Sequence, residues 1–116
     1  MFPYEQLEVY KKAYQVNQKV YCFLRENKNI APYAKNQLGR ASLSIMLNIA
    51  EGSAKLSSRD RKNFFITARG SVFECSSLIN FLYGVGEVAS EFRNDIYIAF
   101  DEISRILYTM IKNLEK

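Results

Sequence analysis

The chain has 116 residues, of which 48% are hydrophobic, and it carries a net charge of +4 without a single histidine. This length suits one domain, residues 1–116, with a sizeable core, and no apolar run reaches the ~20 residues that a membrane-spanning helix needs. The segment Met1–Glu5 lacks the basic and apolar regions of a secretory signal, so we expect a cytoplasmic protein without a membrane partner. Two cysteines, Cys22 and Cys75, are too few for a disulfide framework, and we expect both to be small buried side chains in a reducing environment.

The first predicted helix covers residues 5–27, where apolar side chains recur at spacings of four and three. The row that we expect to face the core consists of Val9, Ala13, Val16, Val20 and Phe23. A second row consists of Leu7, Tyr10, Tyr14, Asn17, Tyr21 and Leu24. Because two rows make a stripe wider than the core of a small bundle needs, the second row predicts a surface that contacts another subunit.

The second predicted helix covers residues 33–53 and follows a break that ends at Pro32, a residue suited to the first turn of a helix. Its core row is Leu38, Ala41, Ile45, Ile49 and Gly52, with Leu43, Leu47 and Ala50 beside it. The third predicted helix is capped by Ser57, with Asp60 reaching back as in a capping box. Its core row is Phe65, Ala68, Val72, Cys75, Ile79 and Leu82, and Gly84–Gly86 ends it.

A fourth helix is predicted to begin with Ser90 as its cap. Its core row is Ile96, Phe100, Ile103, Leu107, Met110 and Leu114. Strand-like alternation is absent, and neither proline lies inside a predicted helix. Since short connections imply antiparallel neighbours, the predicted fold class is all-α, an antiparallel up-down-up-down four-helix bundle.

Polar side chains lie beside the core row of the second predicted helix. They are Arg40, Ser44, Asn48 and Glu51, whose spacing places them on one face. The third helix carries Arg69, Gly70, Ser71 and Glu74 within an otherwise apolar region. Antiparallel packing would bring Asn48 and Glu51 to Arg69. Gly70 costs ~1 kcal/mol relative to alanine in a helix interior, so it predicts a close contact between helices.

Two interpretations of these polar side chains are open, a ligand or catalytic pocket and a structural network. We favour a buried, hydrogen-bonded network of Asn48, Glu51, Arg69 and Glu74 that fixes the register of the helices. Without a histidine, Ser44 is a poor nucleophile, and two cysteines without a carboxylate cluster do not make a metal site. We therefore predict that the protein is not an enzyme and holds no metal or cofactor, with an enzyme that uses Glu51 or Glu74 as a minor alternative.

Basic side chains gather around the turn between the second and third helices. They are Lys55, Arg59, Arg61 and Lys62, while Lys28 and Lys35 lie at the other end of the predicted bundle. Residues 87–116, by contrast, carry four Lys or Arg against six Asp or Glu. On its own, a solubilising turn is the simpler interpretation. In a ring-shaped oligomer, however, several copies of the patch would together strengthen binding to RNA or DNA, because each neutralised phosphate releases counterions.

Three stretches of the sequence resemble one known family. They are Leu7–Ala13, Ala41–Ser53 with its Asn-Ile-Ala-Glu-Gly segment, and Phe65–Ser71 with its Ala-Arg-Gly-Ser segment. Over nearly its whole length the chain resembles the small four-helix-bundle proteins that are encoded within intervening sequences of bacterial 23S ribosomal RNA genes. That resemblance implies a homopentameric ring. It also implies a similarity to the accessory proteins of diversity-generating retroelements, basic barrels that bind nucleic acid and a reverse transcriptase.

The sequence departs from the family pattern in two places. Gly39-Arg40 stands where the family has Arg-Arg, which removes one positive charge, and Cys75-Ser76-Ser77-Leu78 stands where a second acidic or polar residue is expected. Neither departure affects the expected fold. The family label describes the location of a gene rather than an activity, so the function has to be argued from the residues.

Two functional hypotheses follow. The leading one is a non-catalytic oligomer, a homopentamer according to the resemblance, that binds structured RNA through phosphate contacts of Arg40, Lys55, Arg59, Arg61 and Lys62. The alternative is a protein–protein scaffold ring without nucleic-acid binding. In that case the aromatic row on the first helix, with Tyr10 and Tyr14, would bind a protein partner.

Overall fold

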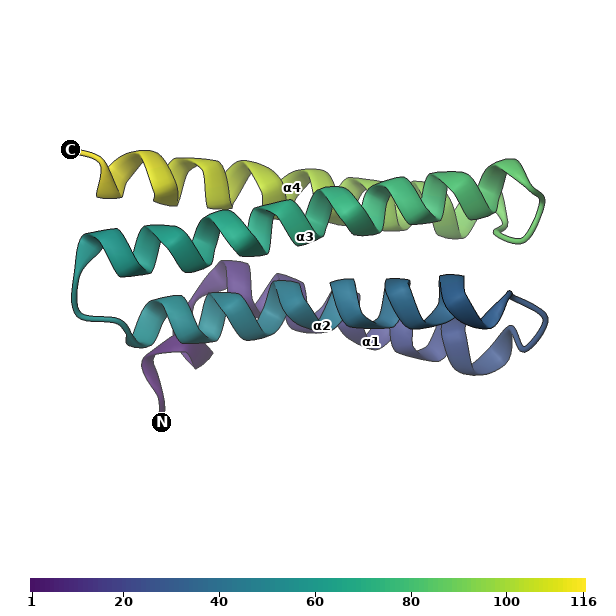
Figure 1. Ribbon diagram of the computed structural model, residues 1–116, viewed down its shortest axis with the longest axis horizontal. Coiled ribbons are helices and arrows are strands. Elements are labelled where there is room, and N and C mark those ends of the chain that lie inside the picture. Colours follow the sequence, from purple (N-terminus) through teal and green to yellow (C-terminus); the bar gives the residue numbers. More distant parts are fainter.

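The computed structural model describes residues 1–116, and four α-helices make up most of the chain. A short 3-10 turn, η1 (Pro3–Gln6), precedes α1 (Glu8–Glu26), α2 (Pro32–Ala54), α3 (Ser58–Gly84) and α4 (Ser90–Leu114). Successive helices run in opposite directions, and the α2–α3 turn lies at the same end of the molecule as both chain termini (Figure 1). The predicted all-α antiparallel bundle is confirmed.

The order of the helices around the bundle follows from which pairs touch. Each helix packs against its neighbour in the sequence, and α1 also packs against α4, whereas the backbones of the diagonal pairs α1–α3 and α2–α4 are not in contact. This is the up-down-up-down arrangement that short connections impose. None of the helices combines the length and the hydropathy that crossing a bilayer requires.

The helix ends differ from the prediction in small ways. The first helix begins at Glu8, three residues later than predicted, because Leu7 is extended (φ −73°, ψ 127°) and separates α1 from η1. The Ser57 hydroxyl caps α3 by accepting the Asp60 N–H at 3.1 Å, but only this half of the capping box forms. At the start of α4 the cap position is Ala89, so the prediction of a Ser90 cap is wrong.

The predicted core rows are buried along the bundle axis, and their side chains form one continuous hydrophobic cluster. The last turn of α4 is the exception, since Ile111 is buried there while Met110 and Leu114 are only half-buried. Cys75 is buried, and desolvation raises the pKa of its thiol to about 12. Cys22 is exposed, so the expectation that both cysteines are buried is wrong for this one.

The second row of α1 does not form one exposed stripe. Tyr14 and Tyr21 are exposed, but Asn17 between them is buried against α2. The Asn17 amide donates hydrogen bonds to the carbonyl oxygens of Ala13 (3.1 Å) and Ser42 (2.7 Å), and its oxygen accepts the Ser42 hydroxyl at 2.9 Å. This fully paired group gives α1 and α2 a polar link inside the apolar interface.

The glycine that lets two helices approach closely is Gly52, on α2. A Cβ added there would lie 2.6 Å from a ring carbon of Phe65 and 3.1 Å from the Cβ of Phe64. A Cβ added at Gly70 would meet no other atom within 4 Å, so the predicted helix contact at Gly70 is wrong. Gly70 lies on the exposed side of α3, whereas Gly52 lies where α2 faces the first turns of α3.

Candidate nucleic-acid interface

The α2–α3 turn brings four of the five predicted phosphate-binding residues together at one end of the bundle. Lys55 is the C-cap residue of α2, and Arg59, Arg61 and Lys62 lie in the first turns of α3. The sequence folds this way locally because Ser57 starts a new helix two residues after Lys55. The N-terminal end of α3 adds partial positive charge beside Arg59, Arg61 and Lys62.

The four basic side chains of the turn differ in exposure and in their contacts with other side chains. Arg59 is exposed and forms no ion pair, and the Lys55 ammonium lies 5.1 Å from the centre of the Phe64 ring. Lys62 is 3.6 Å from a carboxylate oxygen of Glu115. Arg61 is half-buried, and its Nε is enclosed without a hydrogen-bond partner.

Arg40 does not belong to this cluster. It is separated from Lys55 by fifteen positions of α2, which is ~22 Å along a helix. Its exposed side chain instead lines a shallow hollow with Tyr33, Asn36 and Gln37 in the first half of α2. The structure therefore divides the predicted set into a turn cluster and one separate arginine.

The four side chains of the predicted polar network are not joined by hydrogen bonds. Asn48 donates to the carbonyl oxygen (2.8 Å) and hydroxyl (2.9 Å) of Ser44, while Glu51 and Glu74 are exposed and form no ion pair. Arg69 lies on the side of α3 that faces α4, away from α2. The expected contact of Asn48 and Glu51 with Arg69 is therefore absent.

Arg69 instead has a set of partners on α3 and α4. Its Nε donates to the carbonyl oxygen of Ser104 at 3.3 Å, and its guanidinium carbon lies 4.9 Å from the Phe73 ring centre and 5.4 Å from that of Tyr108. This arrangement was not predicted from the sequence. The sequence pattern that could have indicated it is an arginine followed four residues later by an aromatic residue, here Arg69 and Phe73, because this spacing places both on one helix face.

Residues 5–109 match the family model described as 23S rRNA-intervening sequence protein. A similar solved structure is that of a protein with unknown function from the S23 ribosomal protein family of Bacteroides thetaiotaomicron VPI-5482. The two share a TM-score of 0.83 and 23% sequence identity, over 90% of this chain and 98% of that one, so the likeness supports the same fold. Neither description names a catalytic activity, and no curated protein matches. Because the matched stretch spans the first three helices and most of α4, the chain belongs to the 23S rRNA-intervening sequence protein family.

Proposed function

We propose that the protein is a non-catalytic, oligomeric, cytoplasmic nucleic-acid-associated protein that binds structured RNA through phosphate contacts at the α2–α3 turn. The observation that carries this proposal is the cluster of Lys55, Arg59, Arg61 and Lys62 within eight positions of the chain. Of these four cations, only Lys62 has a carboxylate partner. The others keep charge that phosphate groups would neutralise.

The chemistry of this turn suits the backbone of RNA better than its bases. Lysine and arginine side chains at a turn between helices can meet phosphate oxygens without entering a groove, and such contacts carry little sequence information. Binding of this kind releases counterions and therefore weakens steeply as salt concentration rises. A folded RNA, with its closely spaced phosphates, is the expected ligand.

We propose further that the chain forms a homo-oligomeric ring, a pentamer by family likeness. Support comes from the surface between α1 and α2, where Leu43 is 50% exposed and lines a hollow together with the exposed side chains of Tyr14 and Tyr21. This apolar hollow has a volume of about 400 Å³. Contiguous exposed apolar surface of this kind marks an interface. A ring would repeat the basic turn once per subunit and multiply a weak patch.

The proposal is tested by light scattering combined with fluorescence anisotropy on a labelled RNA hairpin, at about 50 and 200 mM salt. Five chains of 13.4 kDa would give a particle of about 67 kDa. We expect wild-type protein to bind at the lower salt and to lose most binding at the higher salt. Arg59→Gln combined with Lys62→Gln should weaken binding, whereas the matched control, Lys28→Gln with Lys35→Gln at the opposite end, should weaken it less.

Three results would count against parts of this proposal. Salt-independent affinity, or equal losses in the two double variants, would exclude phosphate binding at the turn. A ring that ignores RNA at low salt would favour the alternative, a scaffold that organises another protein. A particle with the mass of a monomer would exclude the ring and with it the combined binding by several copies of the basic turn.

A further inference from the structure

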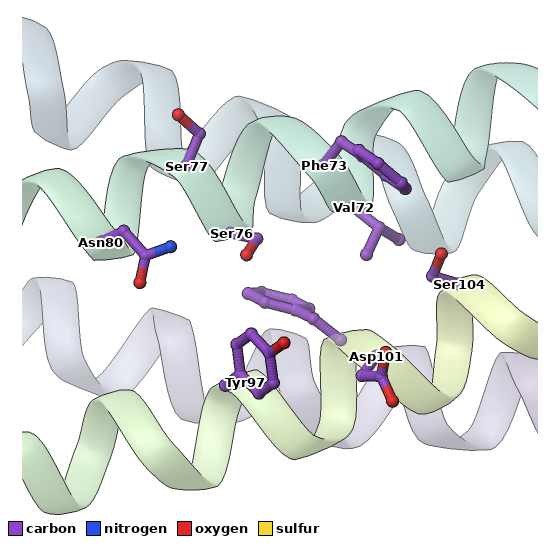
Figure 2. A pocket seen from close by; sticks show the side chains of 9 residues that line it. Val72, Phe73, Ser76, Ser77, Asn80, Tyr97, Asp101 and Ser104 are labelled. Atoms are coloured by element: carbon purple, nitrogen blue, oxygen red, sulfur yellow. The ribbon is translucent and has the colours of Figure 1, made fainter.

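A groove between α3 and α4 combines aromatic and polar side chains on the outside of the bundle. It has a volume of about 370 Å³ and lies along the outer surface of the two helices (Figure 2). Phe73, Ser76 and Asn80 reach it from α3, and Tyr97, Asp101 and Ser104 reach it from α4. The rings of Phe73 and Tyr97 are 56% and 51% exposed, so aromatic faces are available to a ligand here.

An arginine packed between two aromatic rings stands at each end of this groove. At one end the Arg69 guanidinium lies over Phe73 and Tyr108. At the other end the guanidinium carbon of Arg93 is 5.3 Å from the Tyr83 ring centre and 5.8 Å from that of Tyr97. The two clusters resemble each other, since each combines one arginine with one ring from α3 and one ring from α4.

Neither guanidinium is neutralised by a carboxylate. Arg69 donates to the carbonyl oxygen of Ser104, and the Nε of Arg93 donates to the side-chain oxygen of Asn80 at 3.1 Å. These neutral acceptors fix each arginine but leave its positive charge unpaired. The one carboxylate of the groove, that of Asp101, is held by Arg105 at 2.9 Å. The groove therefore presents two fixed cations and exposed aromatic faces.

The surface continues beyond Arg69 into a second hollow of about 470 Å³, which Gly70 and Lys112 help to line. Nothing in the chain needs a glycine at Gly70, because a Cβ there would meet open space. A glycine in a helix interior costs ~1 kcal/mol relative to alanine. Bare backbone beside a fixed arginine leaves room for a flat external group to approach the helix.

The spacing of the two arginines suits a short run of nucleotides. Arg69 and Asn80, the α3 partner of Arg93, are eleven positions apart, which is ~16 Å along the helix. Stacked nucleotides follow one another at ~3.4 Å along a strand, so this length corresponds to roughly five nucleotides. Aromatic faces that alternate with cations are the usual means of holding single strands without sequence preference.

We propose that the α3–α4 groove binds unpaired nucleotides of a single-stranded nucleic acid. The bases stack on Phe73, Tyr97 and Tyr108, and the phosphates meet Arg69 and Arg93. This inference rests on the proposed nucleic-acid function and names a second ligand feature for it. Since α3 carries the basic turn at its start and the groove along its length, a folded RNA with an unpaired extension would contact both.

The test measures the affinity of the whole protein for a labelled single-stranded RNA of about ten nucleotides. Tyr97→Ala combined with Tyr108→Ala removes two exposed rings and should weaken binding roughly tenfold or more. Tyr97→Phe combined with Tyr108→Phe keeps both ring faces and should bind like wild type. Phe81→Ala removes an exposed α3 ring outside the groove, and Arg25→Gln removes an arginine that packs on Tyr21 of α1. Both controls should leave binding unchanged.

Each outcome bears on the groove separately from the turn. Unchanged single-strand affinity in the Tyr97→Ala, Tyr108→Ala variant overturns the groove proposal. If the Arg59→Gln, Lys62→Gln variant still loses hairpin binding, the proposed function stands without the groove. Failure of wild-type protein to bind either RNA overturns both proposals. A change of particle mass in the groove variant would identify the groove as a subunit contact and also overturn its assignment. Equal loss in the phenylalanine variant would overturn the stacking role of the rings.

Discussion

Two glycine-to-alanine changes test how α2 and α3 approach each other. In Gly52→Ala the new methyl group would start 2.6 Å and 2.9 Å from two ring carbons of Phe65, where ordinary carbon contacts are ~3.5–4.0 Å. Phe65 is only 1% exposed, so its ring is enclosed by neighbouring side chains that would have to shift if it moved. Overpacking of this kind costs about 1–3 kcal/mol, against a gain of ~1 kcal/mol from helix propensity.

We expect Gly52→Ala to be less stable than wild type by about 1–2 kcal/mol, because three close contacts place it near the upper end of the overpacking range. Gly70→Ala meets open space and should gain about 0.5–1 kcal/mol. Both variants add one methyl group to a helical glycine, so the difference between their free energies of unfolding reports the local packing.

The measurement is urea unfolding followed by circular dichroism, at one fixed protein concentration because an oligomer's apparent stability depends on concentration. Opposite shifts of the unfolding midpoint are expected. A Gly52→Ala variant as stable as wild type, or a Gly70→Ala variant less stable than Gly52→Ala, would contradict the close contact at Gly52.

Two further predictions concern groups inside the bundle. Asn17→Ala removes the side-chain partner of the Ser42 hydroxyl and carbonyl and should lower the free energy of unfolding in urea by about 1–3 kcal/mol. The control, Asn36→Ala on the exposed face of α2, should change it little. Equal effects of the two changes would exclude the Asn17–Ser42 pair as a stabilising link. Burial raises the pKa of Cys75, so its thiol stays protonated at pH 8, and a thiol reagent should label only exposed Cys22 until the protein is unfolded. Rapid labelling of both cysteines in the native protein would contradict that burial.

The direction of the pH effect at Cys75 follows from its raised pKa. The ordinary pKa of a cysteine thiol, 9.0, applies to the unfolded chain, whereas the pKa of Cys75 in the folded protein is about 12. The contribution of this thiol to stability is therefore fully present below about pH 9 and is lost as the pH rises towards 12.

The sequence by itself determined the four helices, their core rows and their antiparallel order. Spacings of three and four residues match the 3.6-residue turn of an α-helix, so the rows that begin at Val9 and Phe65 are recognisable without a structure. Pro32 and Ser57 mark helix starts for local reasons, namely a missing N–H and a capping hydroxyl. The basic turn follows from the same local logic, because residues close in sequence at one turn remain close in space.

Only the tertiary structure decided what each remaining face touches. Arg69 and Asn48 both lie beside core rows, but the rotation of α3 about its axis turns Arg69 towards α4 and leaves Asn48 with Ser44. The close approach of α2 and α3 lies at Gly52, in the predicted core row, whereas Gly70, where a helix contact was expected, is exposed. The α3–α4 groove combines side chains from two helices, and sequence periodicity describes one helix at a time, so its assembly depended on packing that no single helix encodes.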